Sequence, residues 1–273
     1  MGRFTDDLPS PSRRQVLASV GSGFAGLSGL GLLPVVRRRS LPTDPPTIIG
    51  HRGSQGLGPP NTIEAIEAGL DAGVDGIELD VWRTLDDQLV LSHDAVLDWD
   101  TTGHGWIENN RWADIRGAKV EGTAPVIRFR DALEVLAPTG VEIYVELKGD
   151  ETAGLTLQRA AEYDVLDRLT LISFEDDRLE PALDTGIDTA LLATVPTSTF
   201  ASDAAASGVD AALTHYVPHL TDRFLDKARD EGLTAGIWKL LETDHTLRDS
   251  LEIGPDVIVT NYPDRAIAAY ERR

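Results

Sequence analysis

From residue 47 to the C-terminus, short apolar runs alternate with longer amphipathic stretches. The runs are rich in Val, Ile and Leu, as buried strands are, whereas the stretches carry apolar residues at helical spacing. Eight such repeats predict the α/β class and a closed (β/α)8 TIM barrel, with its active site at the carboxyl ends of the strands. The predicted strands are residues 47–51, 76–82, 141–147, 169–174, 189–194, 211–215, 234–239 and 257–260.

The alternation is interrupted after the second strand. Residues 84–88 predict a tight turn, and residues 89–93 resume as an extra strand with no helix between, so the two strands form a β-hairpin. Residues 95–124 contain Trp and Gly and are predicted to form a loop that decorates one end of the barrel. The predicted helices are residues 61–72, capped by Asn61 and Thr62, and 129–136, 155–163, 178–184, 200–207, 222–231, 245–252 and from 264 onward.

Three carboxylates lie at or near the ends of predicted strands. Glu78 and Asp80 are two positions apart in one strand, so both side chains point to the same face, and Glu146 ends the next barrel strand. Carboxylate oxygens are the donors that Mg²⁺ or Ca²⁺ prefers, whereas few nitrogen donors are present for zinc. The sequence therefore predicts a divalent-cation site, the alternative being acids that only pair with neighbouring Arg or Lys side chains.

Two histidines occur beside these acids. His51 closes the first strand and His93 ends the hairpin strand, and a pair of histidines at such positions can divide the work of general acid and general base near neutral pH. A single histidine at a strand end is often only hydrogen-bonded. The remaining histidines are weaker candidates, namely His104 in the decorating loop, His215, His219, and His245 at the start of a helix.

Two cations and two aromatic residues complete the candidate site. Lys148 shares the face of Glu146, and Arg52 follows His51, so both are placed to hold a phosphoryl oxygen. The alternative for Lys148 is a salt bridge to Glu146 alone. Phe174 and Trp238 end two further strands and are predicted to wall the substrate pocket, although aromatic residues there also serve as ordinary barrel lining.

The chain carries 45 acidic and 25 basic residues, which give a formal net charge of -20. This charge argues against nucleic acid, or an anionic membrane held by charge, as a partner. Our preferred interpretation is adaptation to high salt, in which an acidic surface stays hydrated and its self-repulsion is screened; the alternative is an acidic mesophilic protein. The absence of cysteine excludes disulfides, thiolate metal sites and a cysteine nucleophile.

The N-terminal segment is predicted to direct the chain out of the cytoplasm. Residues 12–17 contain the pair Arg13 and Arg14 and precede a weakly apolar, Gly- and Ala-rich run over residues 16–36, the pattern of a twin-arginine export signal. The alternative is an N-terminal membrane anchor. We therefore predict a signal or anchor over residues 1–40, a Pro-rich linker over 41–46 and a barrel over 47–273. The barrel is predicted to be exported, extracellular or at the cell surface, and an uncleaved anchor would tether it to the membrane through the N-terminus.

With these motifs in order, the chain resembles the glycerophosphodiester phosphodiesterase family. The resemblance covers about four-fifths of the chain, and as a set the motifs are highly specific. They are His51-Arg52-Gly53, Pro59-Pro60-Asn61-Thr62, residues 73–81, His93-Asp94, Thr101-Thr102-Gly103, Glu146-Leu147-Lys148, Ser173-Phe174, Trp238 and residues 260–264.

The resemblance implies a barrel enzyme that cleaves a small-molecule phosphodiester, such as glycerophosphocholine, into glycerol phosphate and an alcohol. It implies a divalent cation, Ca²⁺ or Mg²⁺, on the three acids, and His51 and His93 as the acid and base pair. Two positions depart from the family pattern: Pro60 stands where Glu is usual, and Leu241 where Asn is usual. Neither departure removes an expected ligand, but both leave the choice of substrate open.

Two other functions are compatible with this sequence. An exported enzyme meets intact lipids, so a lipid phosphodiesterase of the lysophospholipase D type is one alternative, and a long apolar groove beside the site would favour it. A catalytically silent binding protein on the same barrel is the second. The presence of all three acids and both histidines argues against the silent barrel.

Overall fold

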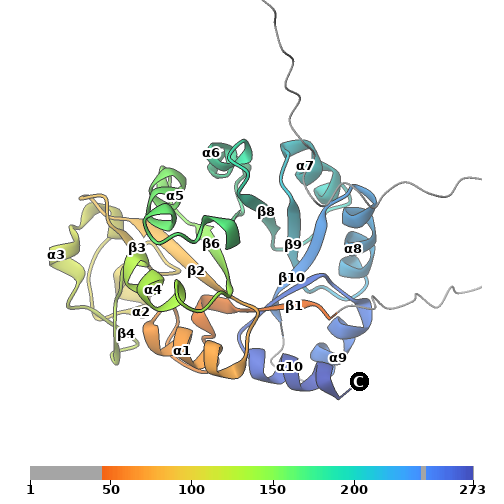
Figure 1. Ribbon diagram of the computed structural model, residues 1–273, viewed down its shortest axis with the longest axis horizontal. Helices are drawn as coiled ribbons and strands as arrows, with labels where there is room; N and C mark the ends of the chain where they lie inside the picture. Colours follow the sequence, from red (N-terminus) through yellow and green to blue (C-terminus); the bar gives the residue numbers. More distant parts are fainter. Residues whose placement is uncertain (1–44, 241–243, 273) are drawn as a thin grey trace, which may run out of the picture. The chain divides into compact units, whose positions relative to one another are not determined.

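A computed structural model describes residues 45–240 and 244–272. Its sheet contains eight parallel strands, and the first strand pairs with both the second and the last, which closes a barrel (Figure 1). The (β/α)8 prediction is confirmed. The barrel strands are β1 (Thr47–Gly50), β2 (Gly76–Arg83), β6 (Glu142–Leu147), β7 (Leu169–Ser173), β8 (Asp188–Ala193), β9 (Ala211–His215), β10 (Thr234–Leu240) and β11 (Val257–Thr260).

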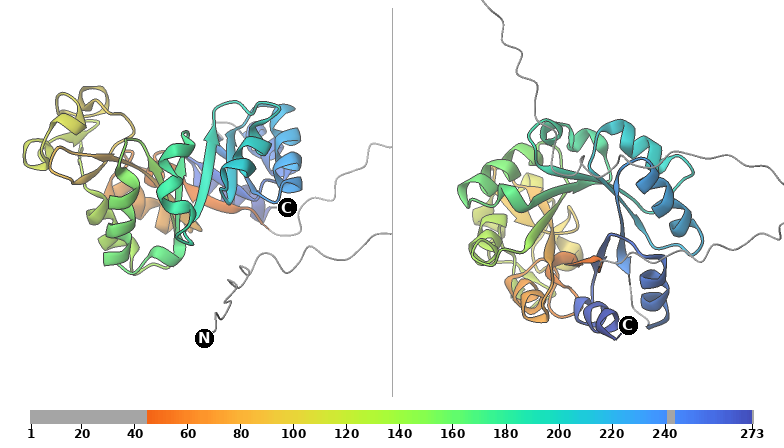
Figure 2. Two further views of the ribbon diagram at one scale, coloured as in Figure 1. Left: turned by 90° about the horizontal axis from the view of Figure 1, so that it is seen from above. Right: turned by 45° about the vertical axis from the view of Figure 1, so that its right-hand side comes forward.

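Helices surround this sheet, as the right-hand view of Figure 2 shows. The first helix begins after Thr62, whose hydroxyl accepts a hydrogen bond from the backbone N–H of Ala65, and ends at Gly73 in the left-handed conformation. Thr62 alone is therefore the N-cap, which leaves the side chain of Asn61 available for another contact. The barrel helices are α1 (Ile63–Ala72), α4 (Phe129–Leu136), α5 (Thr152–Glu162), α6 (Glu180–Leu183), α7 (Phe200–Ser207), α8 (Leu220–Asp230), α9 (Asp244–Ile253) and α10 (Pro263–Glu271).

Two apolar layers hold the barrel together. The outer layer lies between helices and sheet and includes the fully buried Phe129, Leu133 and Ile143. The inner layer fills the barrel, because side chains at alternate positions of each strand point to its axis. Its buried residues are Ile49, Ile172, Ala190, Leu192, Leu213, Val257 and Val259.

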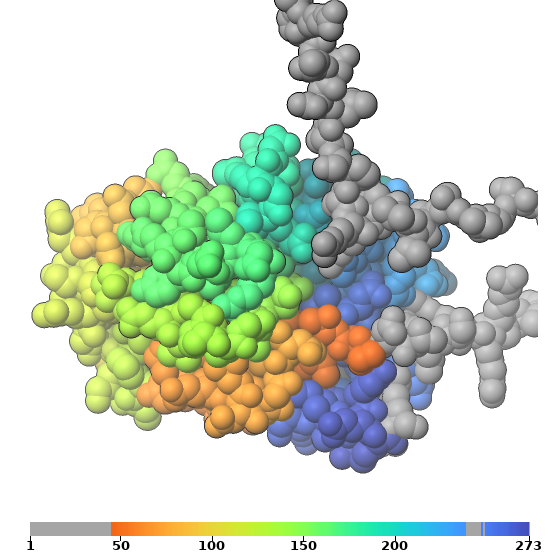
Figure 3. Space-filling view, in the orientation of Figure 1, coloured from red at the N-terminus to blue at the C-terminus, as the bar shows by residue number. Residues whose placement is uncertain are grey.

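The predicted hairpin is confirmed: β3 (Leu89–Leu91) pairs antiparallel with the end of β2. The decorating segment that follows contains short elements of its own, α2 (Leu97–Asp100), α3 (Trp112–Ile115), β4 (Lys119–Val120) and β5 (Ala124–Pro125). They enclose a small apolar cluster that includes Val90, Leu97, Ile107 and Ile115. This lobe of residues 95–125 lies beside β2 and β3 at the left of Figure 1, and the space-filling view shows it continuous with the barrel surface (Figure 3).

Within residues 45–240 and 244–272, no helix has the length and apolar character needed to cross a membrane. Several predictions concern residues outside that part of the chain. The export signal or anchor over 1–40, most of the linker over 41–46, and Leu241 all lie outside the described residues, as does the side chain of His245. These remain predictions from sequence.

Candidate active site

Three buried carboxylates meet where β2 runs beside the carboxyl end of β6. Glu78 and Asp80 lie on the same face of β2, and the register of the parallel pair places Asp80 directly opposite Glu146. Their exposed fractions are 1%, 0% and 7% for Glu78, Asp80 and Glu146. One oxygen from each lies within 4.8 Å of the others. The predicted convergence of the three acids is therefore present in the structure.

The protonation of these acids reflects their crowding. Burial raises the pKa of Glu78 well above its usual range, and the neighbouring charges of Asp80 and Glu146 raise it further. Burial, followed by Asp80, raises the pKa of Glu146 to about 7. Burial also disfavours ionised Asp80, but Lys148 and Arg52 outweigh it and lower the pKa of Asp80 to about 2.

This donor set fits a divalent cation. Among the described residues, Oε1 of Glu78 is buried and has no hydrogen-bond partner, and the buried Oδ1 of Asp80 lies 3.2 Å from Nζ of Lys148. A buried carboxylate oxygen without a partner is costly unless a cation or a proton offsets its charge. Three hard oxygen donors on one face therefore fit Mg²⁺ or Ca²⁺ and offer no soft donor that would select another metal.

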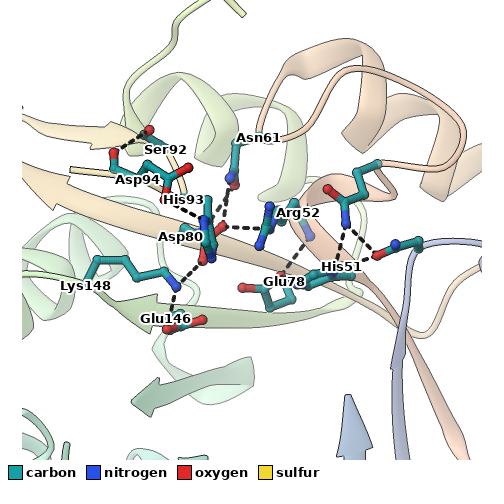
Figure 4. A network of polar contacts seen from close by, with 12 residues as sticks. His51, Arg52, Asn61, Glu78, Asp80, Ser92, His93, Asp94, Glu146 and Lys148 are labelled. Atoms are coloured by element: carbon teal, nitrogen blue, oxygen red, sulfur yellow. Dashed lines mark hydrogen bonds and ion pairs between the residues drawn. The ribbon is translucent and has the colours of Figure 1, made fainter. Parts of the chain in front are cut away.

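Two cations flank the acids (Figure 4). Nζ of Lys148 lies 2.6 Å from Oε1 of Glu146 and 3.2 Å from Oδ1 of Asp80, so Lys148 bridges two acids instead of pairing with Glu146 alone. Nε of Arg52 lies 3.4 Å from Oδ2 of Asp80, and its backbone N–H donates to Oε2 of Glu78 at 2.7 Å. Arg52 has a φ of 51°, an uncommon left-handed conformation that directs this N–H at Glu78.

His51 is buried at the end of β1 and is held through one ring nitrogen. Its Nδ1 lies 2.6 Å from Oδ1 of Asn261, and Nε2 of Gln55 donates to the same oxygen at 2.6 Å. An amide oxygen can only accept, so the contact with Asn261 favours a proton on Nδ1, although Nε2 of Gln55 also lies 3.1 Å from Nδ1. Nε2 of His51 lies 3.9 Å from Oε2 of Glu78. Burial, followed by the charge of Arg52, lowers the pKa of His51 to about 4.

His93 is half-buried at the end of the hairpin. Its Nδ1 lies 3.0 Å from Oδ1 of Asp94, and its carbonyl accepts a hydrogen bond from Nε1 of Trp82 at 3.3 Å. Burial, followed by the charge of Lys148, lowers the pKa of His93 to about 4. A hydrogen bond with Asp94 raises the pKa of Asp100, which shows a second carboxyl group beside the Asp94–His93 pair.

Three amide side chains at the site were not predicted from sequence. Asn61 donates to Oδ2 of Asp80 at 2.8 Å and accepts from the Asp80 backbone N–H at 3.1 Å, so it orients that carboxylate. Gln55 and Asn261 orient His51 as described above. Two features of the sequence indicated these amides: Gln55 lies four positions after His51, and Asn261 lies in the Thr260–Asp264 motif. Neither feature shows which side chain the amide contacts.

A pocket of about 130 Å³ opens beside the acids. Phe174 and Trp238 both line it, with their rings edge to face at 5.4 Å between centroids. His215 packs on Trp238, whereas His104 is exposed and bonded to Asp98 in the lobe. The lining residues are His51, Arg52, Glu78, His93, Glu146, Lys148, Ile172, Phe174, Leu192, Leu213, Trp238 and Val259.

Residues 51–265 match the model of the glycerophosphoryl diester phosphodiesterase family. The chain is 28% identical to the uncharacterised protein YqiK of Bacillus subtilis strain 168, over 81% of this chain and 97% of that protein. It is 24% identical to a glycerophosphodiester phosphodiesterase of Bacillus altitudinis, over 82% and 98%.

Solved structures share the fold. A phosphodiesterase of this kind from Silicibacter pomeroyi DSS-3 superposes with a TM-score of 0.74 at 23% identity, covering 81% of this chain and 91% of that one. A phosphodiesterase of Oleispira antarctica in complex with its product sn-glycerol-3-phosphate gives 0.68 at 20% identity, covering 83% and 97%. From the match over residues 51–265, the chain belongs to the glycerophosphoryl diester phosphodiesterase family and is a phosphoric diester hydrolase.

Proposed function

We propose that this enzyme hydrolyses a soluble glycerophosphodiester to glycerol phosphate and an alcohol, with Ca²⁺ or Mg²⁺ held by Glu78, Asp80 and Glu146. The observation that carries the proposal is the meeting of three buried carboxylates within 4.8 Å, one of them with an oxygen that has no hydrogen-bond partner among the residues the structure describes. A bound divalent cation would supply Lewis-acid stabilisation of charge on the phosphoryl group.

Arg52 and Lys148 are proposed to bind the phosphoryl oxygens. Both already lie within 3.4 Å of Asp80, and both line the pocket. Their contacts with the acids hold each long side chain in place before substrate binds, which lowers the entropic cost of orienting it. Two fixed cations beside a phosphodiester also stabilise the additional negative charge of the transition state.

The contacts of the two histidines support different roles for them. His51 carries its proton on Nδ1 and has a pKa of about 4, so at neutral pH its free Nε2 is suited to accept a proton from the nucleophile. The pKa of His93 is also lowered to about 4, first by burial and then by Lys148, so its role as acid rests on its contact with the Asp94 carboxylate, which stabilises an imidazolium when it forms. The negative charge of a bound phosphodiester would offset the positive charge of Lys148 and so raise the pKa of His93. We assign His51 as the base and His93 as the acid that protonates the leaving alcohol.

This assignment is tested with two glycerophosphodiesters, one that releases an alkyl alcohol and one that releases p-nitrophenol. A p-nitrophenolate needs no proton to leave. His93→Ala is therefore expected to lose about 10² to 10⁴-fold in turnover of the alkyl ester but far less with the nitrophenyl ester, whereas His51→Ala loses activity with both. If His51→Ala instead spared the nitrophenyl ester, the two roles would be exchanged. Equal losses for both variants with both esters would contradict both assignments.

The pocket does not favour the two alternative functions. A lipid phosphodiesterase needs room for an acyl chain, but the apolar side of this pocket, formed by Ile172, Leu192, Leu213 and Val259, belongs to a space of only about 130 Å³. A silent binding protein has no need of two oriented histidines beside a buried acid triad. We therefore propose the soluble diester as the substrate.

We also propose that the protein acts outside the cytoplasm. The support is the pair Arg13 and Arg14 ahead of a weakly apolar run. Replacing both with Lys should retain the chain in the cytoplasm if the segment is a twin-arginine signal. Export that is unchanged by this substitution would contradict the signal, and recovery of the exported chain in the membrane fraction would identify an anchor.

A further inference from the structure

A second and larger cavity adjoins the active site. Its volume is about 410 Å³, and Lys148 is the one residue that lines both this cavity and the smaller pocket. The indole N–H of Trp82, which also lines the cavity, is bonded to the carbonyl of His93. The cavity therefore lies on the His93 side of the site. Its lining consists of Trp82, Arg83, Thr84, Leu85, Glu108, Lys148, Gly149, Asp150, Glu151 and Arg178.

The charges in this lining are balanced. Three cations, Arg83, Lys148 and Arg178, are matched by the three acids Glu108, Asp150 and Glu151. Most are already paired: Arg83 with Glu151 and with Asp87 outside the lining, Arg178 with Asp150 and with Glu175, and Lys148 with the catalytic acids. A ligand with a full charge would gain little from such a lining.

Unused hydrogen-bonding groups remain in the cavity. Nε of Arg178 is buried and, within residues 45–240 and 244–272, makes no hydrogen bond, although Asp150 lies 3.5 Å away as an ion-pair contact. In the part of the chain that the structure describes, the carboxylate of Glu108 has neither a hydrogen bond nor an ion pair. The cavity thus offers the guanidinium donors of Arg178 and the exposed carboxylate of Glu108, which together are the complement of a ligand rich in hydroxyl groups.

We propose that this cavity binds the alcohol that leaves, and that this alcohol is neutral and polyhydroxylated, such as a cyclic polyol or a sugar. The inference rests on the proposed function. The smaller pocket of about 130 Å³ holds the glycerol phosphate half, so the other half of the diester must extend past His93 and Lys148, into the 410 Å³ space. His93, assigned as the proton donor, lines the smaller pocket, and its carbonyl is bonded to Trp82 of the larger cavity.

The lining argues against the two other common kinds of alcohol. An acyl-bearing alcohol needs an apolar wall, but the large apolar side chains here are Trp82 and Leu85 only, among six charged residues. A quaternary ammonium group is attracted by net negative charge or an aromatic cage, and this lining has neither. Hydroxyl groups, by contrast, can both donate to Glu108 and accept from Arg178.

The experiment compares three diesters that share glycerol phosphate and differ in the alcohol, namely the inositol, choline and methyl esters, each with the cation-loaded enzyme. The methyl group is too small to reach the cavity and reports the chemistry alone. We expect kcat/KM for the inositol ester to exceed that of the methyl ester by about tenfold or more, mainly through KM, because a site that hydrogen-bonds hydroxyl groups discriminates strongly against their absence.

Two variants test whether the preference for the inositol ester arises in this cavity. Arg178→Ala and Glu108→Ala are each expected to reduce the preference for the inositol over the methyl ester by about five- to tenfold. Asp114→Ala and Arg116→Ala are matched controls, since both residues are exposed on the lobe and outside the cavity, and they should preserve the preference.

Three outcomes would overturn the inference. Equal rates for the inositol and methyl esters would show that the cavity does not bind the alcohol. A preference for the choline ester that Glu108→Ala abolishes would show that the cavity binds a cation and not a polyol. Both leave hydrolysis of glycerophosphodiesters intact. Failure of the loaded, folded enzyme to turn over all three esters, the methyl ester included, would instead overturn the proposed function, and the subsite with it.

Discussion

Oδ1 of Asn261 lies 2.6 Å from Nδ1 of His51, across 210 positions of sequence. The contact exists because β1 and β11 are neighbours in the closed barrel and His51 and Asn261 follow the paired residues Gly50 and Thr260. Closure of the barrel therefore brings to His51 the acceptor that favours a proton on Nδ1. A hydrogen bond of this kind fixes the ring orientation and leaves the second nitrogen available for chemistry.

Asn261→Ala should lower turnover by about 10- to 100-fold with little effect on KM, because His51 loses the partner that orients it. Asn261→Asp keeps an oxygen at the same place and should retain most of the activity. The imidazole ¹⁵N shifts of His51 give an independent reading: they should report a proton on Nδ1 in the parent and a mixture of tautomers in the Ala variant. Unchanged shifts would show that Asn261 does not determine the tautomer.

Glu78→Gln should abolish metal-dependent turnover while the fold is retained. The raised pKa of Glu78 means that the metal-free enzyme favours the neutral form, which Gln resembles in shape and charge. Calorimetric titration with Mg²⁺ or Ca²⁺ should therefore lose its binding signal, whereas thermal unfolding in chelator should be nearly unchanged. Binding of the cation by the variant with parental affinity would remove Glu78 from the metal site.

Cation binding should strengthen as pH rises through 7. Burial and Asp80 raise the pKa of Glu146 to about 7, so below that pH this carboxyl group must release a proton before it can bind a cation. Affinity is expected to fall by up to about tenfold per pH unit for each proton released. The increase in Tm on adding cation should therefore be small near pH 5.5 and large near pH 8; an increase independent of pH would contradict this.

The free energy of unfolding should increase as salt is raised from low to molar concentration. The net charge of -20 makes the folded chain repel itself, and salt screens that repulsion. Urea unfolding at several KCl concentrations measures the effect. Easier unfolding at molar salt would exclude the adaptation to high salt that the composition suggests.

Much of the fold and the acid triad could be predicted from local pattern. Alternation along a strand placed Glu78 and Asp80 on one face, and adjacency of parallel strands brought in Glu146. The roles of Asn61 and Asn261 could not be predicted. Asn61 contacts Asp80, and Asn261 contacts His51, only because the tertiary fold brings them together. The elements of the lobe, two to four residues each, are too short to show a period.

Metal-dependent hydrolysis of glycerophosphodiesters at this site is the central claim. The most direct test is release of glycerol phosphate from the inositol and choline esters with added Mg²⁺ or Ca²⁺, followed by chelator and then by renewed cation. We expect turnover that the chelator stops and the cation restores, with both effects absent in Glu78→Gln. Turnover that continues in chelator, or a folded protein that cleaves neither ester with either cation, would contradict it.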